Sequence, residues 1–482
     1  MQIKDFLKKN KNIILVFLLF FVIILFIQFR VKEIIGFDGW LHIKMADIIK
    51  KEGFIQSFPY TTESILADNY ADVQLLFRVL LIPFTYFGLM FGAKIAAALF
   101  SALCFTFFYW YLRKNDINYP LLWTSLYAVC SVDLMYRFLE ARAMPLAILS
   151  LVLTFYFIDK KMYKSLLIIS LLFTWLYQGF IFQLLVIVVY FVVDILIRKK
   201  ADFKLLIYPF IGVFLALVIN PYFPKNMGFL YTQLFEVNLI GNLYNMEWRA
   251  WNIKELFMLN YILFILLIIG LFPVVKKMKL EKKSLFFLVL SVIFLVGMLK
   301  TRRMQEYFAP FTVIFAAFSL NENVAKFKGK KAVRYVFIGL ICIIAILSLV
   351  KLDTNIKNNN FLPWYKEGAE WLNENVPNGS KVFINAYTFN YLFFYDPELR
   401  YTHGIDLTYS YLYDKDKFNR YMDALQGKDP GYNIIKDDYN VDYAFVGKIK
   451  QDIKLFDYIV EYKEDFELLY EDESVGILKV KK

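Results

Sequence analysis

The sequence predicts a polytopic α-helical membrane protein that ends in a smaller extracytoplasmic α/β domain. Of its 482 residues, 59% are hydrophobic and 19% are aromatic, whereas soluble domains are nearer half apolar. Apolar runs long enough to cross a bilayer recur between residues 13 and 352. The chain from residue 353 onward is charged and contains no such run. These observations predict a membrane domain at residues 1–352 and a water-facing domain at residues 353–482.

The first apolar run, residues 13–29, sets the predicted orientation of the chain. It carries no charge and is too long for the apolar part of a cleaved signal peptide. Lysines outnumber acidic residues ahead of it, and basic flanks stay in the cytoplasm. The sequence therefore predicts a retained anchor in the plasma membrane, a cytoplasmic N-terminus and an outer first loop at residues 31–94.

The number of spans depends on the apolar run at residues 73–91. Arg78 and Pro83 interrupt this run, and we interpret it as an interfacial helix within the outer loop. The chain then has about eleven transmembrane helices, and each basic cluster beside a span lies in the cytoplasm, apart from Arg302 and Arg303. The predicted spans are residues 13–29, 95–112, 121–134, 145–158, 165–177, 180–197, 205–219, 256–275, 284–299, 307–320 and 333–352.

The C-terminal residues alternate between strand and helix patterns, which predicts an α/β domain. Strands are predicted at residues 381–385, 443–447, 466–470 and 476–480, and helices at 364–374, 416–425 and 452–460.

The charged and metal-binding residue types exclude several functions. The net charge of +12 comes from lysines beside apolar runs, where orientation requires them, so no nucleic-acid partner is expected. The three cysteines lie in apolar runs and only two histidines are present, which argues against a disulfide framework and a histidine-ligated metal.

Three charged groups are predicted to converge on the outer face. They are Asp38 with His42, Asp68 and Asp72; Asp133 with Arg137, Glu140 and Arg142; and Arg302 with Arg303, Glu306 and Tyr307. Asp38 is either an ordinary solvated loop residue or a reactive carboxylate at the membrane surface. Arg302 and Arg303 either pair with Glu306, Glu140 or lipid head groups, or hold a phosphate in their planar forks. Gln178, Glu236, Glu247 and Arg249 are interpreted as solvated loop residues.

A carboxylate near several arginines indicates one kind of chemistry. The arginines can stabilise a lipid phosphate or diphosphate that leaves with growing negative charge. The carboxylate can accept a proton from an acceptor hydroxyl or amide. Glycosyl transfer from a polyprenyl-linked donor in the membrane lipid fits both roles.

The order of these parts resembles the GT-C membrane glycosyltransferases, especially the catalytic subunits of oligosaccharyltransferases. The shared features are Phe37-Asp38 after the first span, Tyr136-Arg137 before the fourth, Arg302-Arg303 with Glu306-Tyr307 before the tenth, and an outer α/β domain led by Glu370-Trp371. The resemblance implies that Asp38 is catalytic and that Arg302 and Arg303 bind the donor phosphates. Arg137 and Arg142 are further phosphate candidates, and His42, Asp72, Glu140, Glu306 and Tyr307 are candidate supporting residues.

Two motifs of that family are missing. The acidic motif before the fourth helix would fall at residues 140–144, where only Glu140 is acidic. Asp38 and Glu140 alone offer few oxygen ligands, so no cofactor is certain; Mg²⁺ or Mn²⁺ would need further carboxylates such as Glu236 or Glu247. The acceptor-reading motif would fall at residues 385–391, which differ from it, so the acceptor stays open.

The sequence leaves three other functions open besides that of a GT-C glycosyltransferase with an unknown acceptor. The first is an oligosaccharyltransferase that modifies protein asparagine. The second is a transporter or flippase of lipid-linked sugars, although no span pair shows corresponding Gly/Pro breaks. The third is a non-catalytic assembly protein that keeps the fold.

Overall fold

The chain folds into two compact units. The computed structural model describes residues 2–237, 247–277, 281–326, 330–404, 406–426, 428, 433–449 and 452–481. Unit 1 comprises Met1–Ile35, Val73–Asn220 and Glu247–Asn359, and unit 2 comprises Gly36–Asp72, Pro221–Met246 and Asn360–Lys482. Residues 36–72 of the predicted first loop thus pack within unit 2, and the C-terminal part of unit 2 begins at Asn360.

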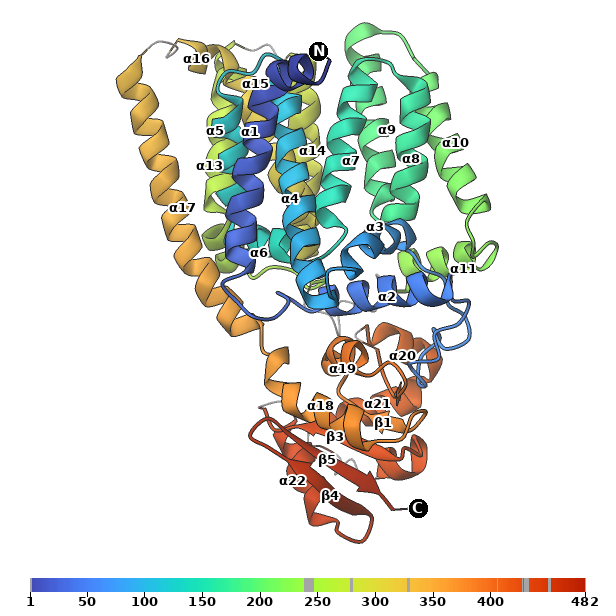
Figure 1. The fold of residues 1–482 in the computed structure, drawn as a ribbon. Coiled ribbons are helices and arrows are strands. Elements are labelled where there is room, and N and C mark those ends of the chain that lie inside the picture. Colours follow the sequence, from blue (N-terminus) through green and yellow to red (C-terminus); the bar gives the residue numbers. More distant parts are fainter. Residues whose placement is uncertain are drawn as a thin grey trace. The chain divides into compact units, whose positions relative to one another are not determined.

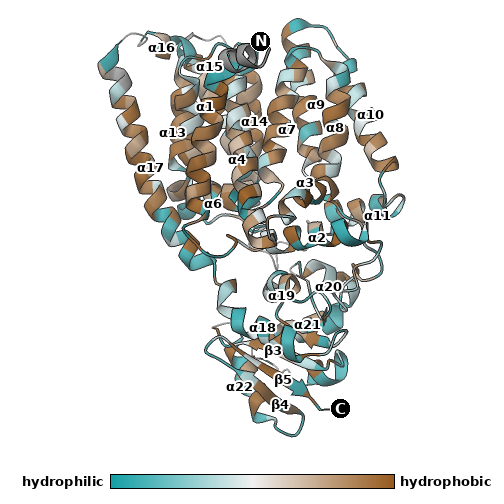
Figure 2. Cartoon of the chain, viewed as in Figure 1, coloured by the Kyte–Doolittle hydropathy of each residue, from teal (hydrophilic) through white to brown (hydrophobic). Residues whose placement is uncertain are grey.

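Unit 1 is helical in its described residues (Figure 1). Its elements are α1 (Gln2–Gln28), α3 (Leu75–Thr85), α4 (Leu89–Lys114), α5 (Pro120–Val129), α6 (Val132–Leu139), α7 (Met144–Asp159), α8 (Tyr163–Leu176), α9 (Phe180–Arg198), α10 (Lys204–Val218), α13 (Ile253–Lys277), α14 (Lys282–Met298), η2 (Arg302–Met304), α15 (Gln305–Ser319), α16 (Asn321–Ala325) and α17 (Lys331–Asn359). Hydrophobic residues, coloured brown, dominate these helices (Figure 2).

The helices of unit 1 make this chain an integral membrane protein. Within the part of the chain that the structure describes, five stretches are long and apolar enough to span a bilayer, in α1, α4, α9, α13 and the helical stretch containing α17. The pair α6 and α7, bent by 104°, would be a sixth span. α3, α5, α8 and α10 are apolar but shorter. The predicted count of eleven spans is therefore not confirmed.

Two predicted boundaries in unit 1 are wrong, and in both cases the backbone explains the difference. The run at residues 73–91 divides at Gly88, whose φ of 85° ends α3 and lets α4 begin at Leu89. The predicted span 121–134 ends at Val129 because Ser131 is extended, with φ −153° and ψ 136°. The chain then restarts as α6, which carries Arg137.

Ion pairs between loops show that the loops of unit 1 lie at two opposite ends of the unit. At one end, Lys283 lies 2.9 Å from Asp159 and Lys161 lies 2.7 Å from Asp202. At the other end, the loop before α7 pairs with the loop before α13 through Arg142 and Glu247, 2.9 Å apart. α7 separates Arg142 from Asp159 by 16 helical residues, or roughly 24 Å. The arginine-rich loops therefore lie opposite the predicted cytoplasmic lysines.

Unit 2 is an α/β unit. Its elements are α2 (Asp38–Glu52), α11 (Lys225–Tyr231), η1 (Thr232–Val237), η3 (Leu362–Tyr365), α18 (Lys366–Asn375), β1 (Lys381–Phe383), η4 (Ala386–Thr388), α19 (Phe389–Tyr395), β2 (Arg400–Tyr401), α20 (Thr408–Tyr413), α21 (Lys415–Leu425), η5 (Ile434–Asp438), β3 (Tyr443–Gly447), α22 (Ile453–Glu461), β4 (Phe466–Glu471) and β5 (Val475–Val480).

The sheet of unit 2 has the strand order β2-β1-β3-β5-β4. β1 is parallel to β2 and β3, whereas β5 is antiparallel to β3 and β4. The four predicted strands are present, and the short strand β2 was not predicted. α2 joins this unit through Trp40, which is wholly buried and lies 4.8 Å from Tyr391 and 4.9 Å from Phe394, measured between ring centroids.

Candidate functional site

Three arginines and three glutamates form a cluster in unit 1, which we call the arginine cluster. Its members are Arg137, Glu140, Arg142, Glu247, Arg303 and Glu306. They come from the last turn of α6, the linker before α7, the loop before α13, η2 and the first turn of α15. Segments more than 150 residues apart in the chain thus meet at one end of the unit.

The bend between α6 and α7 positions the first three members. Glu140 ends α6 in an extended conformation, with φ −73° and ψ 140°. The amide of Arg142 then donates to the carbonyl of Glu140 at 2.9 Å, which makes a tight turn. Pro145 restarts the chain as α7, because proline fits the first helical turn, where an amide has no partner. The sharp turn directs Glu140 and Arg142 toward the end of the unit.

Glu247 lies at the centre of the arginine cluster. Its Oε1 is 2.6 Å from Nη1 of Arg137 and 2.9 Å from Nη1 of Arg142. Its Oε2 is 3.3 Å from Nε of Arg303. Glu306, by contrast, contacts one arginine of the cluster, with its Oε1 2.8 Å from Nη2 of Arg137. The contacts of 2.6 to 2.9 Å have the length of strong, charge-assisted hydrogen bonds. The 3.3 Å contact of Arg303 is an ion pair in which its Nε makes no hydrogen bond.

The side chains of Arg302 and Arg303 have different partners. The guanidinium of Arg303 lies 4.8 Å from the ring centroid of Trp248 and joins the cluster. That of Arg302 lies 4.6 Å from the ring of Trp251, and its Nη2 is 3.0 Å from Glu255. The expected alternative pairing of these arginines with Glu306 and Glu140 is wrong, because Arg137 and Arg142 take those carboxylates.

Two tyrosines lie beside the cluster. Tyr307 is buried at the start of α15, and its ring centroid is 5.2 Å from that of Phe294. Gly179 lies between Tyr307 and Tyr177, and a Cβ there would be 2.6 Å from the Tyr307 hydroxyl and from a Tyr177 ring carbon. Only glycine permits this approach, so the loop that contains Gln178 packs against Tyr307, a contact that the sequence did not predict.

The charges of the cluster keep Glu247 ionised. Partial burial raises the pKa of Glu247, but the charges of Arg137, Arg142 and Arg303 outweigh it and hold this pKa well below its usual value. Its side chain is 31% exposed, against 6% for Glu140 and 5% for Glu306. Glu247 is thus the most accessible carboxylate of the cluster.

The interpretation of Glu247 as a solvated loop residue is therefore wrong. The arginines that pair with Glu247 come from other segments of the chain, so the residues around Glu247 in the sequence do not reveal these pairs. One signal was available: Glu247 precedes Trp248 and lies four residues before Trp251, and both rings stack on arginines. Tryptophan and glutamate together in an outer loop indicate partners for exposed guanidinium groups.

The other predicted site residues belong to unit 2. Asp38 is the first residue of α2 and therefore begins a helix rather than lying in a loop. Its side chain is half-buried. His42 is one turn further along α2 and is 4% exposed, and Asp72 is 6% exposed. The pairing of Asp38 with the arginine cluster stays a prediction.

The residues of the arginine cluster do not suit a hard divalent cation. Glu140, Glu247 and Glu306 each contact arginine nitrogens, whose positive charge opposes a second cation. Among the described residues, no group of three or more His, Cys, Asp or Glu side chains could hold a metal ion. A metal site would need Glu236 or Glu247 to complete it. The contacts of Glu247 with arginines do not support that role.

The stretch predicted to read an acceptor, residues 385–391, is engaged inside unit 2. The amide of Asn385 donates to Asp452 at 2.6 Å, and the Tyr387 hydroxyl donates to the same carboxylate. Burial raises the pKa of Asp452 to about 6, although these two hydrogen bonds act to lower it. Asn385 and Tyr387 therefore support the interior of this unit.

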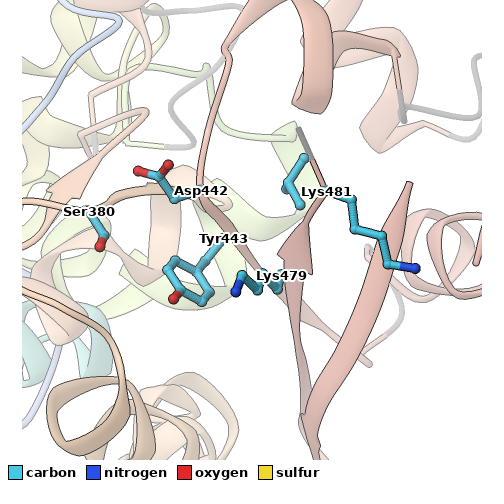
Figure 3. A pocket seen from close by; sticks show the side chains of 6 residues that line it. Ser380, Asp442, Tyr443, Lys479 and Lys481 are labelled. Atoms are coloured by element: carbon cyan, nitrogen blue, oxygen red, sulfur yellow. The ribbon is translucent and has the colours of Figure 1, made fainter. Parts of the chain in front are cut away.

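A shallow pocket of about 380 Å³ lies at the sheet of unit 2 (Figure 3). Ser380, Asp442, Tyr443, Lys479, Val480 and Lys481 line it. The Asp442 carboxylate accepts from the amide of Lys381 at 2.9 Å and so holds β1. None of the predicted site residues lines this pocket.

No family model and no curated protein matches the sequence. Solved structures do match. The oligosaccharyltransferase of Archaeoglobus fulgidus with a tethered acceptor peptide has a TM-score of 0.62 at 11% identity, over 99% of this chain and 75% of that one. The same organism's AglB, in complex with an inhibitory peptide and a dolichol-phosphate, has a TM-score of 0.61 at 11% identity, over 94% and 71%. ArnT from Cupriavidus metallidurans, bound to undecaprenyl phosphate, has a TM-score of 0.56 at 12% identity, over 97% and 98%.

Proposed function

We propose that this chain, which has the fold of the GT-C membrane glycosyltransferases, is itself a glycosyltransferase. It transfers a sugar or oligosaccharide from a polyprenyl-phosphate or -diphosphate donor to an acceptor on the outer face of the membrane. The N-terminus is cytoplasmic in this proposal, and unit 2 is extracytoplasmic. This activity belongs to the synthesis of the cell envelope or of glycoproteins.

The observation that carries the proposal is the arginine cluster at one end of a membrane unit. Arg137, Arg142 and Arg303 are 17%, 11% and 14% exposed, so their charges lie in a partly dry environment. Charged groups at a membrane edge are costly and are usually functional. Guanidinium groups converging there can bind the phosphate of a lipid whose chains stay in the bilayer.

The same arginines supply the transition-state stabilisation that the reaction needs. When the bond between the anomeric carbon and the phosphate oxygen breaks, negative charge grows on the leaving phosphate. Fixed positive charges in a partly desolvated site stabilise this growing charge more than the ground state. Arg303 and Arg137 take this role, with Arg142 beside them.

Asp38 is the general base of the proposed reaction. Asp38 is the first residue of α2, where the helix dipole favours a negative charge. It removes a proton from the acceptor hydroxyl or amide as that group attacks the anomeric carbon, which requires hydrogen-bond reach of the acceptor. His42 and Asp72 support it.

The neighbours' ligands agree with this donor class. AglB is described with a dolichol-phosphate and ArnT with undecaprenyl phosphate, and both compounds are polyprenyl phosphates. The acceptor differs in our proposal from a peptide sequon, because Asn385 and Tyr387 are engaged with Asp452. Oligosaccharide transfer to protein asparagine stays the second candidate, since the oligosaccharyltransferase has the same fold.

The test uses the purified full chain in nanodiscs with radiolabelled sugars linked to undecaprenyl phosphate or diphosphate. Host membranes depleted of the protein provide acceptors, and a sequon peptide is a separate arm. Label moving to a membrane acceptor supports the proposal, and label on the peptide favours the oligosaccharyltransferase alternative. Label that crosses the bilayer while still attached to its lipid would instead indicate a flippase. No binding of either lipid would leave the non-catalytic alternative.

A further inference from the structure

Glu247 occupies the position in the arginine cluster where an anionic ligand would bind. Both of its carboxylate oxygens face guanidinium nitrogens, at 2.6 and 2.9 Å for Oε1 and 3.3 Å for Oε2. Carboxylates and phosphates bind arginine forks through the same arrangement of oxygens. An anion that binds these three arginines must therefore compete with Glu247.

From this contact pattern we propose that Glu247 is an internal competitor of the donor phosphate, displaced when the phosphate binds. The inference rests on the proposed function, because it concerns the same arginines. It adds a regulatory element to that site: the arginines are neutralised and held in place by Glu247 until a lipid phosphate replaces it.

The charge balance of the cluster supports this exchange. With Glu247 in place, three arginines face three carboxylates. Once Glu247 leaves, Glu140 and Glu306 oppose three positive charges, and the site carries a net positive charge that suits an anion. Glu140 and Glu306 are fixed in the α6–α7 bend and in α15, and both are almost wholly buried.

The backbone of Glu247 is held independently of its carboxylate. Its carbonyl accepts from the Thr301 hydroxyl at 3.0 Å, and the carbonyl of Arg249 accepts from the amide of Arg302 at 3.1 Å. Glu247 also lies outside the helices, before α13 begins at Ile253. A rotation of the side chain is therefore enough to remove the carboxylate, without rearrangement of the loop.

Protonation does not release Glu247. The surrounding arginines hold its pKa well below the usual value against the effect of burial, so the group stays charged near neutral pH. Release thus requires a competing anion. This makes occupancy of the arginines depend on the donor lipid rather than on pH.

The experiment compares Glu247→Gln with the wild-type chain in nanodiscs and titrates undecaprenyl phosphate. We expect the variant to bind at least about tenfold more tightly, because the loss of one charge-assisted competitor is worth at least that factor. The matched control is Asp202→Asn, which removes an acidic partner of Lys161 at the opposite end of the unit. Its affinity should equal that of the wild type.

Equal or weaker binding by Glu247→Gln overturns the proposal and makes Glu247 a residue that organises the arginines. If the variant does not fold, the wild type supplies the second test. A water-soluble carbodiimide with glycine methyl ester should modify Glu247 more when undecaprenyl phosphate is present, as measured by peptide mass spectrometry. Unchanged or reduced modification contradicts displacement. If the wild-type chain binds no polyprenyl phosphate, the proposed function is refuted. If it binds the lipid but Glu247 is not displaced, only the present inference fails.

Discussion

Arg302 and Arg303 are adjacent in the sequence, yet their guanidinium groups stack on different tryptophans and pair with different carboxylates. Arg303 lies over Trp248 and reaches Glu247, whereas Arg302 lies over Trp251 and reaches Glu255. Only Arg303 therefore joins the arginine cluster. Arg302 is 31% exposed and its partner Glu255 is 51% exposed, so water screens that pair.

This divergence predicts unequal effects of the two arginines. Arg303→Ala should lower kcat/KM for the lipid donor by roughly 10²- to 10³-fold, because it removes a preorganised charge from a partly dry site. Arg302→Ala should cost about fivefold or less, as expected for a screened pair. Arg303→Lys should recover only part of the activity, since lysine lacks the planar fork. Equal losses for the two alanine variants would exclude Arg303 as the principal phosphate ligand.

The second prediction concerns Asp38. Asp38→Asn keeps the shape of the side chain and removes the charge, so we expect sugar transfer to fall on the order of 10²-fold or more. Binding of undecaprenyl phosphate and the temperature of unfolding should change little, because Asp38 is half-buried at a helix start. The control is Asp47→Asn on the same helix, where Asp47 pairs with Lys50 and Lys51 at 2.7 Å. Normal transfer by Asp38→Asn would remove its role as the base.

The third prediction is topological. Cysteines at Lys160 and Lys199, at the lysine-rich end of unit 1, should be labelled from the cytoplasmic side. A cysteine at Lys300, beside η2, should react from outside. Exposed Cys342 is first replaced by serine, and membrane-impermeant maleimide on intact cells distinguishes the two sides. Outer labelling at Lys160 would invert the predicted orientation.

The fourth prediction is a pH dependence in unit 2 that arises from Asp452. Burial raises the pKa of Asp452 from 3.8 to about 6. Between these values the folded state binds more protons than the unfolded state, so the stability of unit 2 falls as the pH rises from 4 to 6 and is constant above. The size of the change is about 3 kcal/mol at most.

Hydrogen exchange of the β3 amides in the full chain measures this change, after correction for the intrinsic rate. Asp452→Asn should abolish the slope between pH 4 and 6. Asp438→Asn, which breaks a surface pair with Arg420, should keep it. A slope that persists in Asp452→Asn would assign it to another group.

The predicted α/β domain follows from sequence patterns that are local. β3 begins and ends at the bounds of the predicted strand at residues 443–447, and α21 and α22 match the helices predicted at 416–425 and 452–460 to within one residue. β2 was missed because it has only two residues and is defined by its pairing with β1. Residues 36–72 were also assigned to the membrane domain, because the burial of Trp40 against Tyr391 is a contact between distant segments.

The sequence by itself determined the membrane character of unit 1 and the arginines that gather at one of its ends, since apolar length and charge are properties of short segments. The side of the membrane on which each loop lies stays a prediction. Only the tertiary structure decided which carboxylate each arginine meets. Glu247 lies 110 residues from Arg137, and the adjacent residues Arg302 and Arg303 pair with different carboxylates. The reason is physical: ion pairs depend on distances of a few ångströms between side chains, and the packing of helices sets these distances.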